Sequence, residues 1–189
     1  MQKFVNNVGT YLIDRHALQR DDLDVFAYGL DLMLFSLLSV LGLLSLGLLT
    51  GHFRETVFCL AVFVPMQTTG GGYHAKTHIR CFFTMVTGWI VAMMLCHILP
   101  LWATIIFMAQ GIAAVLMYAP IEHVNAPMSD RQKNKMRVFA RSVCILSALA
   151  VCGLYATQPP ASAALAIGLG MTGISMRVAC HMKRNQNNP

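Results

Sequence analysis

The amino-acid sequence predicts an all-α integral membrane protein, and three observations support this fold class. Of the 189 residues, 56% are hydrophobic and only 12% are charged, whereas about a quarter of the residues in a soluble domain are charged. The hydrophobic residues form six runs, most of them close to the ~20 residues that a membrane-spanning helix needs. Lysine and arginine residues concentrate in alternate connections between these runs. We therefore expect a single membrane domain, residues 1–189, with about six transmembrane helices.

Residues 1–24 are mixed rather than uniformly apolar, and they predict an amphipathic helix on the membrane surface. Phe4, Val8, Tyr11 and Leu12 recur at the spacing that places them on one face of a helix. A helix with one apolar and one charged face is typical of segments bound at the membrane interface. No cleavable signal peptide is expected, because the apolar run begins late and no small-residue cleavage site precedes it.

Six apolar runs follow residue 24, and each is predicted to cross the membrane. The second run is the shortest and ends near Pro65, so this span is expected to be tilted, thin or partly re-entrant. Pro100 closes the third run, and Gln158-Pro159-Pro160 forms the turn before the sixth. The predicted spans are residues 25–49, 55–68, 82–99, 101–118, 138–157 and 161–179.

The basic residues predict the orientation of these spans. With six spans and a cytoplasmic N-terminus, all but one of the 14 lysine and arginine residues lie at the cytoplasmic face or just inside a helix end there. Arg54 alone lies on the other side. Because cytoplasmic loops of membrane proteins are enriched in lysine and arginine, both termini are expected to be cytoplasmic. The basic excess thus reflects topology, and no nucleic-acid partner is expected.

Residues 68–81 form a polar segment between two apolar runs, at the predicted cytoplasmic face. The segment ends in Cys81, which is predicted to begin the third span. The positive end of the helix dipole favours a thiolate at such a position. Lys76 and Arg80 add positive charge that acts in the same direction. A thiolate with a base nearby is the usual arrangement for covalent acyl transfer, so we expect a cysteine–histidine peptidase site here.

Two histidines are candidates for the base that would activate Cys81. His78 lies three residues before Cys81 and would share its face on a regular helix. His74 lies seven residues before Cys81, about 10 Å along a helix axis, which is beyond hydrogen-bond reach unless the chain bends. Three glycines permit such a bend and could leave backbone N–H groups free to bind an oxyanion. These glycines are Gly70, Gly71 and Gly72.

A metal site is the alternative interpretation of the same segment. His74, His78 and Cys81 are spaced so that they would align on a helix as three zinc ligands with an open fourth position. No HExxH pattern accompanies them, and no adjacent acidic residue is present to act as a general base. We therefore expect no metal and no cofactor, and a metal-dependent membrane hydrolase stays as the alternative.

Two further features could support the site. Asp31 lies about six residues inside the first predicted span. A charge at such depth is commonly functional, and this carboxylate could orient a histidine. A basic run follows the fourth span, and it would bind anionic lipid headgroups or dock an acidic peptide tail. The candidate docking residues are Lys76, Arg80, Arg131, Lys133 and Lys135.

Two sequence motifs resemble a known family. Gly71-Gly72-Tyr73-His74-Ala75 followed by Cys81, and Tyr118-Ala119-Pro120 followed by a basic loop, are similar to the accessory gene regulator B family of bacterial membrane endopeptidases. The resemblance covers most of the chain in span order and loop placement. It implies that Cys81 is the nucleophile and that His74, rather than His78, is the catalytic histidine, on a bent connection.

The resemblance also implies a function. Members of this family cleave the C-terminal part of a quorum-sensing signal propeptide and help to form a cyclic thiolactone or lactone peptide. The chain would then act as a homodimer in the bacterial cell membrane. The family often carries an arginine seven residues before the catalytic histidine, and Gln67 occupies that position here. Gln67 is counted with Asp31 and His78 among the supporting residues.

A non-catalytic peptide transporter or channel is the remaining alternative from a different functional class. Such proteins usually place ionisable residues within the membrane as relays or binding groups. Asp31 is the one clear candidate for that role in the predicted spans. The sequence therefore favours the peptidase.

Overall fold

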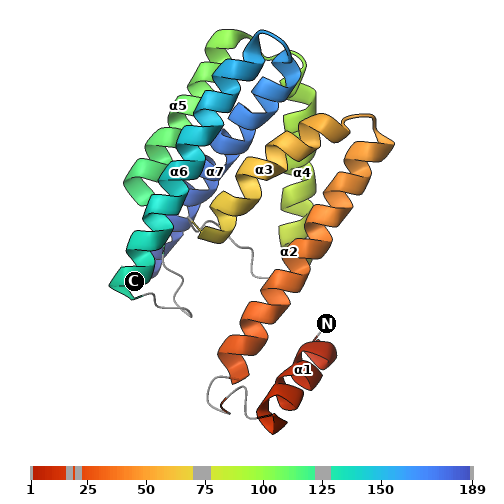
Figure 1. Cartoon of the computed structure of the whole chain (residues 1–189), viewed down its shortest axis with the longest axis vertical. Helices are drawn as coiled ribbons and strands as arrows, with labels where there is room; N and C mark the ends of the chain where they lie inside the picture. Colours follow the sequence, from red (N-terminus) through yellow and green to blue (C-terminus); the bar gives the residue numbers. More distant parts are fainter. Residues whose placement is uncertain (1, 16–18, 20–22, 70–77, 122–128, 188–189) are drawn as a thin grey trace.

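The computed structural model describes residues 2–15, 19, 23–69, 78–121 and 129–187. Within these ranges the chain forms seven α-helices and no β-strand, and Figure 1 shows their arrangement. The helices are α1 (Gln2–Asp14), α2 (Leu23–Leu49), α3 (Phe53–Thr69), α4 (His78–Cys96), α5 (Leu101–Tyr118), α6 (Asp130–Tyr155) and α7 (Pro159–Asn187).

Helices α2 to α7 run alternately up and down, so their connections gather at two opposite ends (Figure 1). The short turns at residues 50–52, 97–100 and 156–158 lie at one end, which we call the turn end. The last residues of α3 and α5 and the first residues of α4 and α6 lie at the other end, which we call the site end. This alternation places Gln67, Arg80, Cys81 and the first turns of α6 at the site end.

Helix α7 is the central helix of the bundle, and it packs against α3, α4, α5 and α6. Residues 161–170 of this helix are all buried. Small side chains allow the close approach: a Cβ atom added to Gly168 would lie 2.7 Å from the backbone oxygen of Cys59 on α3. Small residues serve the same purpose in most contacts between membrane helices.

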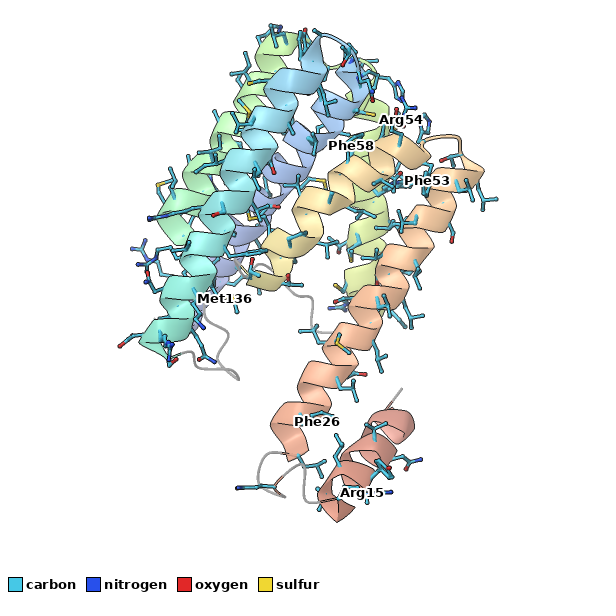
Figure 2. The ribbon with its side chains drawn as sticks, viewed as in Figure 1. Arg15, Phe26, Phe53, Arg54, Phe58 and Met136 are labelled. Atoms are coloured by element: carbon cyan, nitrogen blue, oxygen red, sulfur yellow. The ribbon has the colours of Figure 1, made fainter. Side chains whose placement is uncertain are left out.

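The core consists of two clusters of buried apolar side chains on either side of α3. One lies between α3, α5, α6 and α7, and the other between α2, α3, α4 and α7. Phe58 of α3 packs against both clusters and so joins them (Figure 2). The outer faces of α2, α4, α5 and α6 carry exposed large apolar residues, as expected of helices that contact lipid.

Five helices are long and apolar enough to cross a membrane, which confirms the prediction of an all-α, multi-pass membrane protein. They contain the segments Gly29–Leu49, Ile79–Cys96, Leu101–Tyr118, Asp130–Tyr155 and Pro159–Met182. The remaining predicted span is α3, which has 17 residues and contains Pro65. A helix of that length falls short of the ~20 residues needed for a full crossing, so the sixth span stays a prediction.

Several helix ends differ from the predicted span ends, because the apolar run marks the membrane crossing and not the whole helix. Helix α4 begins at His78 rather than residue 82 and ends at Cys96 rather than residue 99. Helix α6 begins at Asp130 rather than residue 138. Its N-terminus is stabilised by a capping box between the side chains and backbones of Ser129 and Gln132.

The two terminal segments also form helices. The predicted N-terminal helix is present as α1, which packs against α2 (Figure 1). Arg15 directly follows this helix. Its guanidinium lies 5.4 Å from the ring centre of Tyr11. At the other terminus α7 extends to Asn187, beyond the predicted end at residue 179.

Candidate active site

The candidate active site lies at the site end of the bundle, where α3 ends and α4 begins. Residues 70–77 join these helices and lie outside the described residues. They include the predicted catalytic residue His74, the glycines Gly70, Gly71 and Gly72, and Lys76. The predicted bend that brings His74 to Cys81 therefore stays a prediction. The described residues define the two helix ends that frame the segment.

Cys81 is the fourth residue of α4 and lies half-buried in the first turn of the helix. Helix α4 therefore begins three residues before Cys81, the residue predicted to begin the third span. His78, Ile79 and Arg80 precede the apolar run but continue the helix outward. The first turn still has backbone N–H groups without helical partners, and the effect of the helix dipole extends over it. The activation of Cys81 as a thiolate stays a prediction.

His78 is the first residue of α4, so its backbone lies one helical turn from Cys81. This spacing on a regular helix is what the sequence predicted for His78. The side chain of His78 lies outside the described part of the chain. Arg80 is exposed at the same turn.

The start of α4 is anchored against α2. The ring of Phe82 lies over Gly42 of α2, where an added Cβ atom would be 3.7 Å from the ring. Phe82 also makes an edge-on contact with Phe83, with 6.4 Å between the ring centres. These contacts fix the helix turn that carries Cys81.

Asp31 is half-buried on α2, but it lies at a different level from Cys81. Eleven residues separate Asp31 from Gly42, which corresponds to about 16 Å along the helix. The apolar segment identified in α2 is Gly29–Leu49. The depth of Asp31 in the membrane and its orienting role toward His74 both stay predictions.

Gln67 lies in the last turns of α3 and connects this helix to α7. Its amide nitrogen donates a hydrogen bond to the Ser175 hydroxyl at 3.2 Å, and the amide oxygen is 3.3 Å from the same hydroxyl. Both side chains are partly buried. Gln67 thus holds the end of α3 against the central helix. The sequence did not identify Ser175, because it is distant in the chain and stands in no motif.

The end of α3 is closed by its own side chains. The hydroxyl of Thr69 donates to the backbone oxygen of Pro65 at 2.6 Å, and that of Thr68 donates to the oxygen of Val64 at 3.1 Å. Both hydroxyls thus bond back to carbonyl groups one turn earlier in the same helix, as threonine side chains often do within helices. Helix α3 ends at Thr69, directly before the glycines in the sequence.

The predicted basic face is present on the first turns of α6, at the site end. Arg131 and Lys135 are exposed, and Lys133 is half-buried with its Nζ 3.9 Å from the Asp130 carboxylate. Met136 marks this part of α6 in Figure 2. The described cations are thus placed at the same end of the bundle as Cys81, where they could meet an acidic peptide or anionic lipid.

One group of potential metal ligands occurs in the described part of the chain, and it is not the predicted one. It consists of His52, Glu55 and His97 at the turn end. The alternative metal site predicted from His74, His78 and Cys81 includes side chains that lie outside the described residues. The sequence signal for the observed group was two histidines in two short connections.

Comparison with known proteins gives one family match. The family described as Accessory gene regulator B matches residues 2–176. AgrB-like protein 1 of Clostridium perfringens (strain 13 / Type A) is 21% identical over 141 residues, which cover 72% of this chain and 75% of the relative. No solved structure matches the chain.

Proposed function

Because the chain belongs to the accessory gene regulator B family, which processes quorum-sensing peptides, we propose that it is a membrane cysteine endopeptidase. Its substrate would be a signal propeptide, from which it removes the C-terminal part. The observation that carries this proposal is the place of Cys81, half-buried in the first turn of α4 at the site end. A thiol in that position has the backbone environment of an activated nucleophile.

The proposed reaction begins with attack by the Cys81 thiolate on the carbonyl carbon of the scissile peptide bond. A carbon–sulfur bond forms, the carbon–nitrogen bond breaks, and protonated His74 gives its proton to the leaving amine. The product is an acyl-thioester on Cys81. Backbone N–H groups of Gly70, Gly71 and Gly72 would bind the oxyanion of the tetrahedral intermediate.

Cyclisation would follow from the same thioester. A thiol or hydroxyl within the acyl peptide attacks the thioester carbonyl, and its proton passes to His74. A ring thioester or ester forms as the bond to Cys81 breaks, which regenerates the thiolate. Exchange of one thioester for another is nearly balanced in free energy, so a thiolactone can form without ATP.

Water must be kept from the acyl-enzyme for cyclisation to compete with hydrolysis. The N-terminal half of α2 extends beyond the start of α4 (Figure 1). The first half and the middle of α2 carry exposed apolar side chains, among them Met33, Leu37 and Leu38. An apolar helix beside the site supports the proposal, because it lowers the local concentration of water.

The basic residues at the site end would position the substrate. Arg80, Arg131 and Lys135 are exposed there, and Lys76 and Lys133 belong to the same predicted docking set. Clustered cations attract an acidic peptide and raise its rate of association. A homodimer in a bacterial membrane, with both termini in the cytoplasm, completes the proposal.

Cleavage of a propeptide by the full chain in membrane vesicles tests the assignment of residues. Cys81→Ser and His74→Ala are each expected to lower the cleavage rate more than about a thousandfold, because nucleophile and base act as one unit. His78→Ala is expected to keep the rate within about tenfold. Cys152→Ser is the matched control, since Cys152 is an exposed thiol on α6.

Three outcomes would contradict the proposal. Cleavage by Cys81→Ser at the wild-type rate would show that Cys81 is not the nucleophile. Loss of cleavage in His78→Ala with activity kept in His74→Ala would transfer the role of base to His78. Full inhibition by a chelator, reversed by zinc, would instead favour the metal-dependent hydrolase.

A further inference from the structure

Three polar side chains gather at the turn end, far from the candidate active site. His52 lies in the turn before α3, Glu55 in the first turn of α3, and His97 directly after α4. His97 follows Cys81 by sixteen positions along α4 and its end, which corresponds to about 24 Å. The chemistry proposed for Cys81 makes no use of this group.

The ligand atoms of these residues are close enough to share one metal ion. All three lie within 4.8 Å of one another, and Nδ1 of His52 is 3.1 Å from Nε2 of His97. Two imidazole nitrogens bound to zinc at ~2.0–2.1 Å in tetrahedral geometry are about 3.3 Å apart. The two rings are tilted by 54° with centres 4.9 Å apart, and without an ion the two nitrogens share a hydrogen bond.

We propose that His52, Glu55 and His97 form a binding site for a divalent transition-metal ion of the zinc type. Two imidazoles and one carboxylate are a common zinc ligand set, which leaves the fourth tetrahedral position to water. His97 is exposed and the other two residues are half-buried. An ion can therefore reach the site from solvent at the turn end.

The backbone around His52 is held by the buried core. The carbonyl oxygen of His52 accepts hydrogen bonds from the backbone N–H of Thr56 at 3.0 Å and from its hydroxyl at 2.7 Å. The same Thr56 hydroxyl accepts a bond from Trp89 Nε1 at 2.9 Å. Trp89 belongs to α4, the helix that leads to His97, so both histidines are positioned by one network.

The charged and nucleophilic neighbours do not compete for the site. Arg54, labelled in Figure 2, donates a hydrogen bond from its guanidinium to the side-chain oxygen of Gln158, in the α6–α7 turn, at 3.5 Å. Within the described part of the chain, Glu55 forms no salt bridge. Cys96 is buried, and its thiol donates to the backbone oxygen of Met93. The carboxylate of Glu55 is thus available to an ion.

A bound ion would join the α2–α3 turn to the α4–α5 turn. These turns connect four helices that otherwise contact one another mainly through apolar side chains. Binding to the folded state alone raises stability in proportion to the logarithm of the metal concentration. The site is therefore expected to act as a metal clamp on the turn end.

Zinc binding to the full chain in detergent micelles tests the proposal. The chelator-treated protein is dialysed against micromolar zinc, and bound metal is counted by mass spectrometry. Wild type and Cys81→Ser are each expected to bind about one zinc ion more than the His52→Ala/His97→Ala variant. His181→Ala, an exposed histidine on α7, is the matched control and should bind as much as wild type.

A second measurement guards against a folding defect in the double variant. Glu55→Gln keeps the size of the side chain and is expected to weaken zinc binding at least about tenfold. Zinc should raise the unfolding temperature of wild type and Cys81→Ser but not of the double variant. Equal zinc content in wild type and the double variant, or no zinc bound by wild type, would overturn the proposal. Loss of the ion in Cys81→Ser alone would instead place the metal at the site end, near Cys81.

Discussion

Thr56 shows how a single polar residue organises three helices. It is completely buried, and its hydroxyl joins the backbone of His52 to the indole of Trp89. A Cβ atom added to Gly47 of α2 would lie 2.5 Å from the same hydroxyl oxygen. Thr56 thus stands where α2, α3 and α4 meet, and a glycine is required opposite it.

Replacement of Thr56 by valine keeps the shape of the side chain and removes these hydrogen bonds. The Trp89 N–H would then be buried without a partner, so we expect a loss of about 1–2 kcal/mol in stability. Thermal unfolding of the purified protein in detergent measures this loss. Thr84→Val is the control, because the Thr84 hydroxyl is exposed and bonds within its own helix to the oxygen of Arg80. Equal unfolding temperatures for the two variants would contradict the role given to Thr56.

Pairings between distant residues were not predictable from the sequence. Gln67 and Ser175 are 108 positions apart, and His52 and His97 are 45 apart. Their contacts depend on how helices pack, which hydropathy patterns do not specify. Cys81 was identifiable because its neighbours in the chain are polar and basic. The choice of His74 over His78 came from the family resemblance and stays a prediction.

At the scale of elements, the centre of the bundle depends on small residues of α7. Gly168 approaches the backbone of Cys59 on α3, and Gly173 approaches Ala114 and the backbone of α5. Backbones can come this close only where no side chain intervenes. A methyl group added at Gly168 would overlap the Cys59 backbone, whereas one added at Gly173 would require its neighbours to shift slightly.

Gly168→Ala is therefore expected to destabilise the protein by about 1–3 kcal/mol, because its new Cβ atom would overlap the Cys59 backbone oxygen. Gly153→Ala on α6 is the matched control, since nothing lies within 4 Å of a Cβ atom there. Alanine favours a helix over glycine, so the control should be unchanged or more stable by up to about 1 kcal/mol. Thermal unfolding in detergent distinguishes the two. A stable Gly168→Ala variant would show that α3 and α7 can separate.

The elements themselves were largely predictable, whereas their ends were not. Each apolar run became one helix, since a backbone in lipid must satisfy its own hydrogen bonds. The polar extensions of α4, α6 and α7 lie outside the runs and leave no trace in hydropathy. The start of α6 could have been found from Ser129 and Gln132, whose spacing is that of a capping box.

At the scale of the whole molecule, the two ends of the bundle differ in chemistry. The site end carries Cys81 and the exposed cations of α4 and α6, and the turn end carries His52, Glu55 and His97. If lysine and arginine mark the cytoplasmic side, the proposed peptide chemistry and the proposed metal site lie on opposite faces of the membrane. This division requires that α3 crosses the membrane, although it has only 17 residues.

Labelling of single cysteines decides whether α3 crosses. Thr50→Cys, Asn134→Cys and Thr157→Cys place exposed thiols before α3, at the start of α6 and after α6, in a chain whose own cysteines are replaced. Three crossings separate residues 50 and 134 if α3 spans the membrane, and two if it does not. We therefore expect a membrane-impermeant maleimide to label Thr50→Cys and Thr157→Cys in intact cells, but Asn134→Cys only after permeabilisation. Labelling of Thr50→Cys and Asn134→Cys from the same side would show five crossings and move the turn before α3 to the face that carries Cys81. The proposed metal site would then be split, because α4 still separates His97 from that face.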